Sequence, residues 1–182
     1  RKGRNWIYAI QLCSAQSSSH GGVKENQGSG RQAVKLRAGV IMRDDLFQKV
    51  LAKTALAILT DDSDNIIWET DKSPVSGMYR AYFKNKFSES KDMILYASQA
   101  GIAMGIMAGQ IPIRECHAVK VSEGGLRLLK EEGVKSAYEE IIPLIKSSKD
   151  DNIICPIEQF LYEHEERQEQ WRFLEARFKG RN

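Results

Sequence analysis

The sequence predicts an α/β domain in which short strands alternate with helices. Segments of strand type and of helix type follow one another along residues 42–164, which is the pattern of helices covering a sheet. The chain has 182 residues, of which 42% are apolar and 28% charged, so it can bury a core of ordinary size. Its longest apolar stretch, Ile94 to Ile113, is interrupted by Gly, Ser and Gln and does not predict a membrane span.

The first 41 residues differ from the rest in composition. They hold seven Lys or Arg residues and a single acidic residue, Glu25, which gives a net charge of +6 and leaves −3 for residues 42–182. We interpret this segment as a leader: upstream sequence read in frame before Met42, a transit peptide, or a disordered arm. The basic charge of the chain lies there and not in the domain, so the sequence does not predict nucleic acid as a partner. We expect a cytoplasmic protein, or an organellar one if the leader is a transit peptide.

A helix and a hairpin are expected to open the domain, which begins at Met42. Two Asp residues precede apolar residues at helical spacing, which predicts an amphipathic helix from Asp44 to about Lys53. Two apolar segments, Ala55–Leu59 and Asn65–Thr70, then flank a polar tip. Such a pattern is typical of a β-hairpin.

The segment Met93–Met107 is apolar and rich in Ala and Gly, and we expect it to form a buried helix. A weaker segment from Ser73 to Phe83 precedes it. The small residues would let this helix approach a sheet closely, and Pro112 follows its end. We interpret its glycines as packing positions, since a phosphate-binding loop needs them between a strand and a helix start.

The last third of the domain is expected to alternate strand and helix. A strand over Ile113–Val121 leads to a helix that Ser122 and Glu123 begin and Gly133 ends. The remaining segments are a strand over Ala137–Ile145, a polar loop over 147–152, and a final helix that starts at Cys155-Pro156.

Cys155 is the most reactive candidate in the sequence. Pro156 favours the first helical turn, so Cys155 falls at the N-cap and Glu158 at the third position. A thiol there would face the positive end of the helix dipole, which favours the nucleophilic thiolate. The charge of Glu158 opposes this effect, and its position is also explained by capping. Cys155 is therefore either a nucleophile or a structural cap.

The sequence predicts no metal site. Three cysteines lie far apart, without a CxxC pair. Cys116 and His117 are neighbours on a predicted strand, so their side chains should point to opposite faces and play structural roles. We expect no cofactor.

The domain resembles an uncharacterised family of bacterial and archaeal proteins with a cytidine-deaminase-like fold. The resemblance covers Met42 to His164 and rests on VSEGGLRLLKEEGV (121–134), YEEIIP (138–143) and CPIE (155–158). It implies a deaminase-like layered sheet with an N-terminal hairpin and flanking helices. The zinc ligands and the catalytic Glu of deaminases are absent. Asp92 and the pair Ser122-Glu123 stand at the corresponding helix starts, and Gln99 stands where similar proteins tend to have Lys.

Residues 165–182 extend beyond the region of resemblance. We expect them to continue the final helix, because Trp171, Leu174 and Phe178 recur at helical spacing. An apolar stripe on a terminal helix docks on its own domain or on a second copy, and we favour a homodimer contact.

Two functions follow from these observations. The first is a binding or regulatory module for a nucleotide-like small molecule, with Ser122 and Glu123 as ligand-binding residues. The second is a cysteine-dependent enzyme acting on a nucleotide-like or nucleobase-like substrate, with Cys155 as nucleophile, Glu158 as a further catalytic residue and Ser122 or Asp92 as the orienting group. The absence of a deaminase motif favours the binding module.

Overall fold

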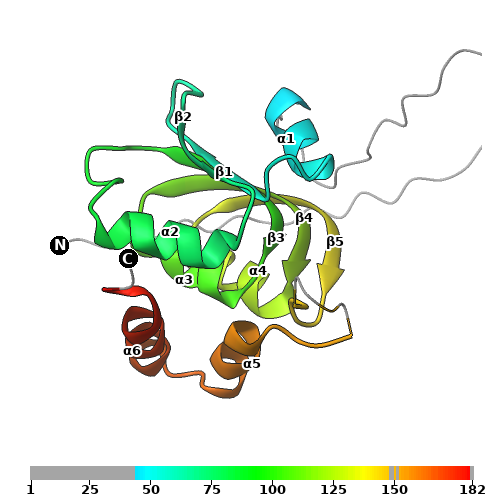
Figure 1. Ribbon diagram of the computed structural model, residues 1–182, viewed down its shortest axis with the longest axis vertical. Coiled ribbons are helices and arrows are strands. Elements are labelled where there is room, and N and C mark those ends of the chain that lie inside the picture. Colours follow the sequence, from blue (N-terminus) through cyan, green and yellow to red (C-terminus); the bar gives the residue numbers. More distant parts are fainter. Residues whose placement is uncertain (1–43, 148–149, 151, 181–182) are drawn as a thin grey trace, which may run out of the picture. The chain divides into compact units, whose positions relative to one another are not determined.

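Five strands form one mixed sheet in the part of the chain that the structure, a computed structural model, describes: residues 44–147, 150 and 152–180 (Figure 1). The leader over residues 1–41 lies outside the described residues. The strands are β1 (Ala57–Thr60), β2 (Ile66–Thr70), β3 (Met93–Ala100), β4 (Ile113–Ser122) and β5 (Lys135–Ile142). The helices are α1 (Asp44–Leu51), α2 (Pro74–Phe83), α3 (Ile102–Ala108), α4 (Glu123–Glu131), α5 (Pro156–Glu163) and α6 (Arg167–Phe178).

The order of the strands across the sheet is β2-β1-β3-β4-β5. β1 is antiparallel to β2 and to β3, which confirms the predicted hairpin. β3, β4 and β5 are parallel neighbours joined through α3 and α4. The α/β class is therefore confirmed, and the carboxyl ends of three strands lie at the same edge of the sheet. The likeness to the deaminase layering remains a prediction.

The two faces of the sheet carry different numbers of helices. α1 packs Phe47 and Val50 against Ile58 and Tyr96 on one face. The other face is covered by α2, α3 and α4, and α5 and α6 form a further layer that contacts α3 and α2 (Figure 1). Most of the apolar core lies on this second face. None of the described helices combines the length and the apolar character needed to cross a membrane.

The buried helix predicted over Met93–Met107 is wrong, because the segment is a strand followed by a short helix. β3 occupies Met93–Ala100 in the middle of the sheet, Gly101 follows, and α3 begins at Ile102. A central strand that is buried on both faces needs apolar residues at consecutive positions, so it lacks the alternation that identifies a half-buried strand. The glycine that we assigned to packing within a helix stands between a strand and a helix.

The apolar stripe on α6 is buried within the domain, so the stripe docks on its own chain, and the expected homodimer contact through the C-terminal helix stays a prediction. Leu174 and Phe178 are buried, and Trp171 is partly buried against the same core. The ring of Tyr79 on α2 lies 6.0 Å from that of Trp171 and 5.4 Å from that of Phe178. α6 is also a separate helix, because the chain leaves the helical conformation between α5 and α6, contrary to the single helix expected.

Candidate functional site

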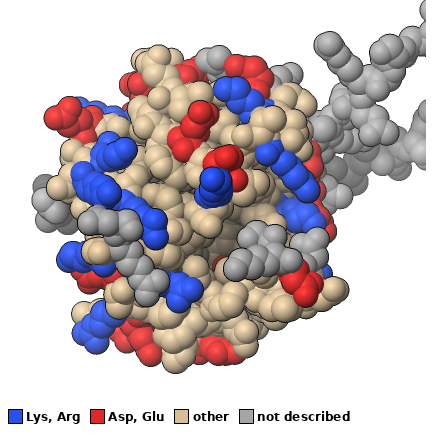
Figure 2. All heavy atoms as spheres, in the orientation of Figure 1, with Lys and Arg blue, Asp and Glu red and all other residues tan. Residues whose placement is uncertain are grey.

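A cavity of about 390 Å³ opens beside the carboxyl end of β3, between α2, α5 and α6. Its volume lies within the range of about 300–1,000 Å³ that is usual for small-molecule sites. The position matches the general rule that ligands of α/β proteins bind beyond the carboxyl ends of the strands. Figure 2 shows a hollow on this side of the domain with Lys and Arg side chains around it. The lining residues used below are Ser73, Ser76, Arg80, Gly101, Ala103, Ile145, Lys146, Cys155, Ile157, Glu158, Arg177 and Phe178.

The carboxylate of Glu158 is the buried polar group of this cavity. The residue is 3% exposed, and its Oε2 accepts a hydrogen bond of 2.9 Å from the N–H of Ile102 at the start of α3. Its Oε1 has no hydrogen-bond partner among the described residues. The capping role that the sequence suggested is therefore wrong: the side chain crosses to another helix, and the N–H of Cys155 donates instead to the carbonyl of Ile145, at 2.9 Å.

Burial raises the pKa of Glu158 above its ordinary value. The hydroxyl of Ser122 and the amides of Ile102 and Ile145 act in the opposite sense, because donors nearby favour the ionised carboxylate. Among the described residues, the Ile102 N–H forms a hydrogen bond with Oε2, and none of these donors forms one with Oε1. The result is a carboxyl group that is held in place through one oxygen and available through the other.

Small residues bring the helix starts close to this carboxylate. A Cβ at Gly101 would collide with the carboxylate of Glu158 and would lie 2.6 Å from Cγ1 of Ile145. A Cβ at Gly125 in the first turn of α4 would lie 2.8 Å from the carbonyl oxygen of Ala100. The start of α3 is thus occupied by the protein's own acid, so this strand–helix junction has no room for a phosphate.

Two helices begin at the cavity without side-chain caps. Ser73 precedes α2 and Cys155 precedes α5, and neither side chain accepts a hydrogen bond from its helix. The first amides of a helix have no partner within it and carry a partial positive charge. Ser76 and Arg80 lie four residues apart on α2, so they share a helix face with Ser73 and extend this polar surface along the cavity.

Three cations surround the cavity. Arg80 on α2, Lys146 after β5 and Arg177 on α6 line it and are exposed. Within the described part of the chain, no ion pair involves any of the three. Arg177 does contact an aromatic ring, since its guanidinium lies 5.9 Å from the centroid of Phe173. The rim therefore attracts anions.

The structure brings together some of the residues predicted from sequence and separates others. Cys155 and Glu158 line the cavity. Ser122 is fully buried beside Glu158, where its hydroxyl caps α4 by accepting the N–H of Gly125 at 3.1 Å. Glu123 is exposed and is not among the lining residues.

Asp92 lies at the wrong end of β3 for the role that we expected. It directly precedes Met93, whereas the cavity adjoins Gly101, after the last residue of the strand. Eight strand residues span about 26 Å. Asp92 therefore cannot orient Cys155.

Sequence reasoning missed the three cations and the contact between Glu158 and Ile102. Arg80, Lys146 and Arg177 come from three elements that are distant in sequence. No local spacing connects them, so no motif could have identified them. A strand assignment for Met93–Ala100 would have placed Gly101 at a strand end, which is the one available signal.

The remaining chemistry-bearing residues are structural. Cys116 is buried in the core on the helix-rich face, and burial raises the pKa of its thiol to about 12. His117 points to the face that carries α1 and stacks on Tyr96 with ring centroids 5.0 Å apart. This confirms that the two neighbours point to opposite faces. Among the described residues, no group of His, Cys, Asp and Glu is placed to hold a metal ion.

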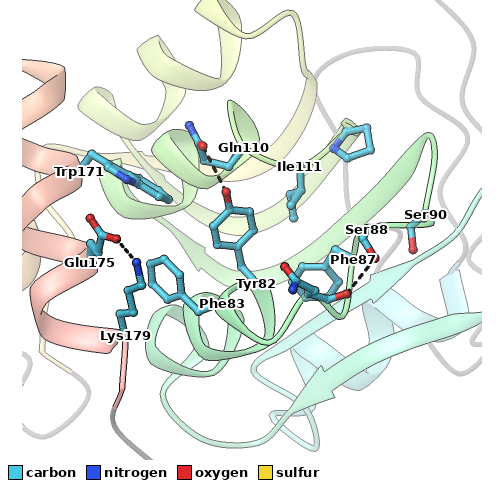
Figure 3. A pocket seen from close by; sticks show the side chains of 12 residues that line it. Tyr82, Phe83, Phe87, Ser88, Ser90, Gln110, Ile111, Trp171, Glu175 and Lys179 are labelled. Carbon is cyan, nitrogen blue, oxygen red and sulfur yellow. Dashed lines mark hydrogen bonds and ion pairs between the residues drawn. The ribbon is translucent and has the colours of Figure 1, made fainter.

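A second cavity of about 670 Å³ lies near the amino-terminal ends of β3 and β4 (Figure 3). Its aromatic wall consists of Tyr82, Phe83 and Trp171, which contact one another. Its two charged groups neutralise each other, because Lys179 pairs with Glu175 at 2.6 Å. It contains no buried polar atom without a partner among the described residues. The cavity beside Glu158 is therefore the stronger candidate.

Comparisons with known proteins give a family and a fold. Residues 46–178 match the family described as TM1506, domain of unknown function (DUF1893). Among solved structures, a DUF1893 family protein (TM1506) from Thermotoga maritima matches with a TM-score of 0.59 and 17% sequence identity, over 76% of this chain and 93% of that chain. At this identity the likeness shows the fold alone. No protein with a curated description matches the chain.

Proposed function

The chain belongs to the DUF1893 family, and on that premise we propose that its domain is a binding module for a small phosphorylated, nucleotide-like molecule held in the cavity beside Glu158. The proposal rests on one observation above all. Three exposed cations and the starts of α2 and α5 converge on the same cavity. Positive side chains and free helix amides are the groups that bind phosphate.

The rest of the lining suits a ligand with an apolar, planar part. Ile145, Ile157 and Phe178 provide apolar walls, while Glu158 provides a hydrogen-bond acceptor. A cavity with apolar walls and a few fixed polar groups is the usual form of a small-molecule site. A nucleotide carries both parts, an anion for the rim and a flat ring for the interior.

We expect removal of a rim cation to weaken phosphate binding. Arg80→Ala and Arg177→Ala should each weaken the binding of ribose 5-phosphate by about tenfold, because a hydrogen bond to a charged group contributes roughly 1.5–3 kcal/mol and about 1.4 kcal/mol corresponds to tenfold. Isothermal titration calorimetry measures the loss. Arg172→Ala is the matched control, since Arg172 lies on α6 and is exposed but does not line the cavity.

Added salt gives an independent check on the same interaction. Binding through exposed cations should weaken as the ionic strength rises, because salt screens them. If ribose 5-phosphate and nucleoside monophosphates all fail to bind the wild-type protein, or if both Arg variants bind as well as the control does, the proposed function is wrong.

Cys155 gives a second candidate function, a cysteine-dependent enzyme, because the thiol lines the same cavity and is partly exposed. The cysteines of the described residues, Cys116 and Cys155, are both free, which supports our proposal of a reducing compartment such as the cytoplasm. Among the described residues, the lining of the cavity includes no His that could serve as a base. This favours the binding module.

Alkylation of Cys155 distinguishes the two functions. With Cys13 and Cys116 replaced by Ser, a catalytic thiol should react with iodoacetamide at neutral pH much faster than free cysteine, because the thiolate is the reacting form. A binding module should react no faster than free cysteine, and ribose 5-phosphate should slow the reaction by covering the thiol. Mass spectrometry follows the modification. An alkylation rate that is high and stays high as the pH is lowered would favour the enzyme.

A further inference from the structure

We infer that Glu158 selects the ligand by accepting a hydrogen bond from a ring N–H, while the phosphate of the same ligand lies at the rim beside Arg80. The inference rests on the proposed function and adds to it the chemical class of the ring. The ligand is a nucleotide whose base presents an N–H donor, as hypoxanthine, guanine and uracil do.

The exposure of the lining residues distinguishes a rim of the cavity, which water reaches, from a buried floor. Arg80, Lys146 and Arg177 are exposed, whereas Glu158 is 3% exposed. A bound anion therefore meets the cations where water also reaches, and only the opposite end of the ligand can reach the carboxylate. The order of the groups along the cavity thus sets the orientation of an elongated ligand.

At the floor of the cavity, one carboxylate oxygen of Glu158 accepts a hydrogen bond and the other does not. Oε2 is held by the N–H of Ile102 at 2.9 Å, and Oε1 has no partner among the described residues. A buried acceptor without a partner is unfavourable, and a ligand that donates to it removes that cost. A ligand without a donor leaves the cost in place and loses affinity.

One oxygen of the carboxylate is fixed by its surroundings. Oε2 accepts the Ile102 N–H at 2.9 Å and lies so close to Gly101 that a Cβ there would collide with it, and Cγ1 of Ile145 lies beside the same position. Because these contacts orient the carboxylate before a ligand binds, Oε1 can discriminate between donors and acceptors. The residues beside it, Gly101, Ala103 and Ile145, suit the edge of a flat uncharged ring better than a hydrated ammonium group.

Three ligands test the inference on the wild-type full chain by calorimetry. Ribose 5-phosphate reports the phosphate end alone. Inosine 5′-monophosphate adds a base with a ring N–H, and purine riboside 5′-monophosphate replaces that N–H with a bare ring nitrogen. We expect inosine 5′-monophosphate to bind about tenfold more tightly than the purine riboside analogue, as a hydrogen bond to a charged acceptor predicts.

Glu158→Gln tests the same contact from the protein side. Its amide oxygen can still accept the Ile102 N–H, so an NH₂ group takes the place of Oε1. The variant should bind inosine 5′-monophosphate about tenfold more weakly than the wild type and should lose the preference for it over the purine riboside analogue. Glu163→Gln, an exposed change on the same helix, is the control and should behave as the wild type.

The outcomes separate this inference from the proposed function. If ribose 5-phosphate binds but the two nucleotides bind equally to the wild type, the role of Glu158 is wrong and the binding module stands. If none of the three ligands binds, both are wrong. If Glu158→Gln does not fold, as judged by circular dichroism, the comparison of the two nucleotides on the wild-type protein decides the question.

Discussion

A single carboxylate joins three segments of this domain that are distant in sequence. Glu158 on α5 accepts the first amide of α3 and lies beside the hydroxyl of Ser122, which caps α4. An acid is stabilised at a helix start because the free amides there carry partial positive charge. In this position the carboxylate is removed from water, which disfavours its charged form and raises its pKa. It therefore makes the stability of the domain sensitive to pH.

We expect Glu158 to destabilise the fold as the pH rises. Its folded-state pKa lies above the ordinary value of 4.5, so its contribution is fully present below about pH 4.5 and is lost as the pH rises through the folded-state value. Glu158→Gln stays uncharged, so the stability difference should shift in favour of the variant between pH 4 and 7, by about 1.4 kcal/mol for each unit by which the two pKa values differ. Urea unfolding at a series of pH values measures it.

The exposed residue Glu163 provides the reference for this measurement. Glu163→Gln lies on the same helix and should run parallel to the wild type over that range. If the free energy of unfolding of Glu158→Gln also ran parallel to that of the wild type over this pH range, the carboxyl group of Glu158 would have the same pKa in the folded and unfolded states. That result would contradict the effect of its burial.

At the scale of elements, α6 is part of the core. Its Leu174 is fully buried, and the side-chain amide of Gln170 donates to the carbonyl of Leu161 on α5 at 2.7 Å. Tyr79 of α2 contacts the aromatic rings of α6 and donates its hydroxyl to the carbonyl of Ala103 on α3, at 2.9 Å. These contacts hold α6 against α2, and in this position α6 supplies Arg177 and Phe178 to the cavity.

We expect Leu174→Ala to destabilise the domain by about 2–5 kcal/mol, because it removes a fully buried side chain and leaves a cavity. Chemical denaturation measures the loss, and the exposed Arg172→Ala should cost little. The loss should not depend on protein concentration, since the contact lies within one chain. A midpoint that rises with concentration would show instead that the stripe on α6 joins two copies.

The assignment of Met93–Met107 shows why local pattern was insufficient at this scale. Apolar residues at nearly every position fit a buried helix and a central strand equally well. The choice depends on the neighbours, since β3 pairs with β1 on one side and β4 on the other. Half-buried elements were easier: the first helix, the hairpin, β4 and the cap at Ser122 match their predictions within a few residues, because water on one face imposes a visible period.

At the scale of the whole domain, the cavity forms where helices of different layers meet the end of a central strand. α2 and α6 come together with the end of β3 and the start of α5, and the cations are contributed by three different elements. The parallel arrangement of β3, β4 and β5 places the junctions Gly101-Ile102 and Ser122-Glu123 at one edge of the sheet. The opposite edge, where Asp92 lies, faces the aromatic cavity of Figure 3.

The sequence by itself determined the α/β class, the family, most element boundaries and the place of Cys155 before its helix. These features depend on local periodicity, capping residues and short motifs, which the chain carries at fixed spacing. Only the tertiary structure decided that Met93–Ala100 is a strand, that α6 docks on its own domain, and that Glu158 meets Ile102 beneath three cations. Those outcomes depend on burial and on contacts between residues far apart along the chain, for which local spacing holds no signal.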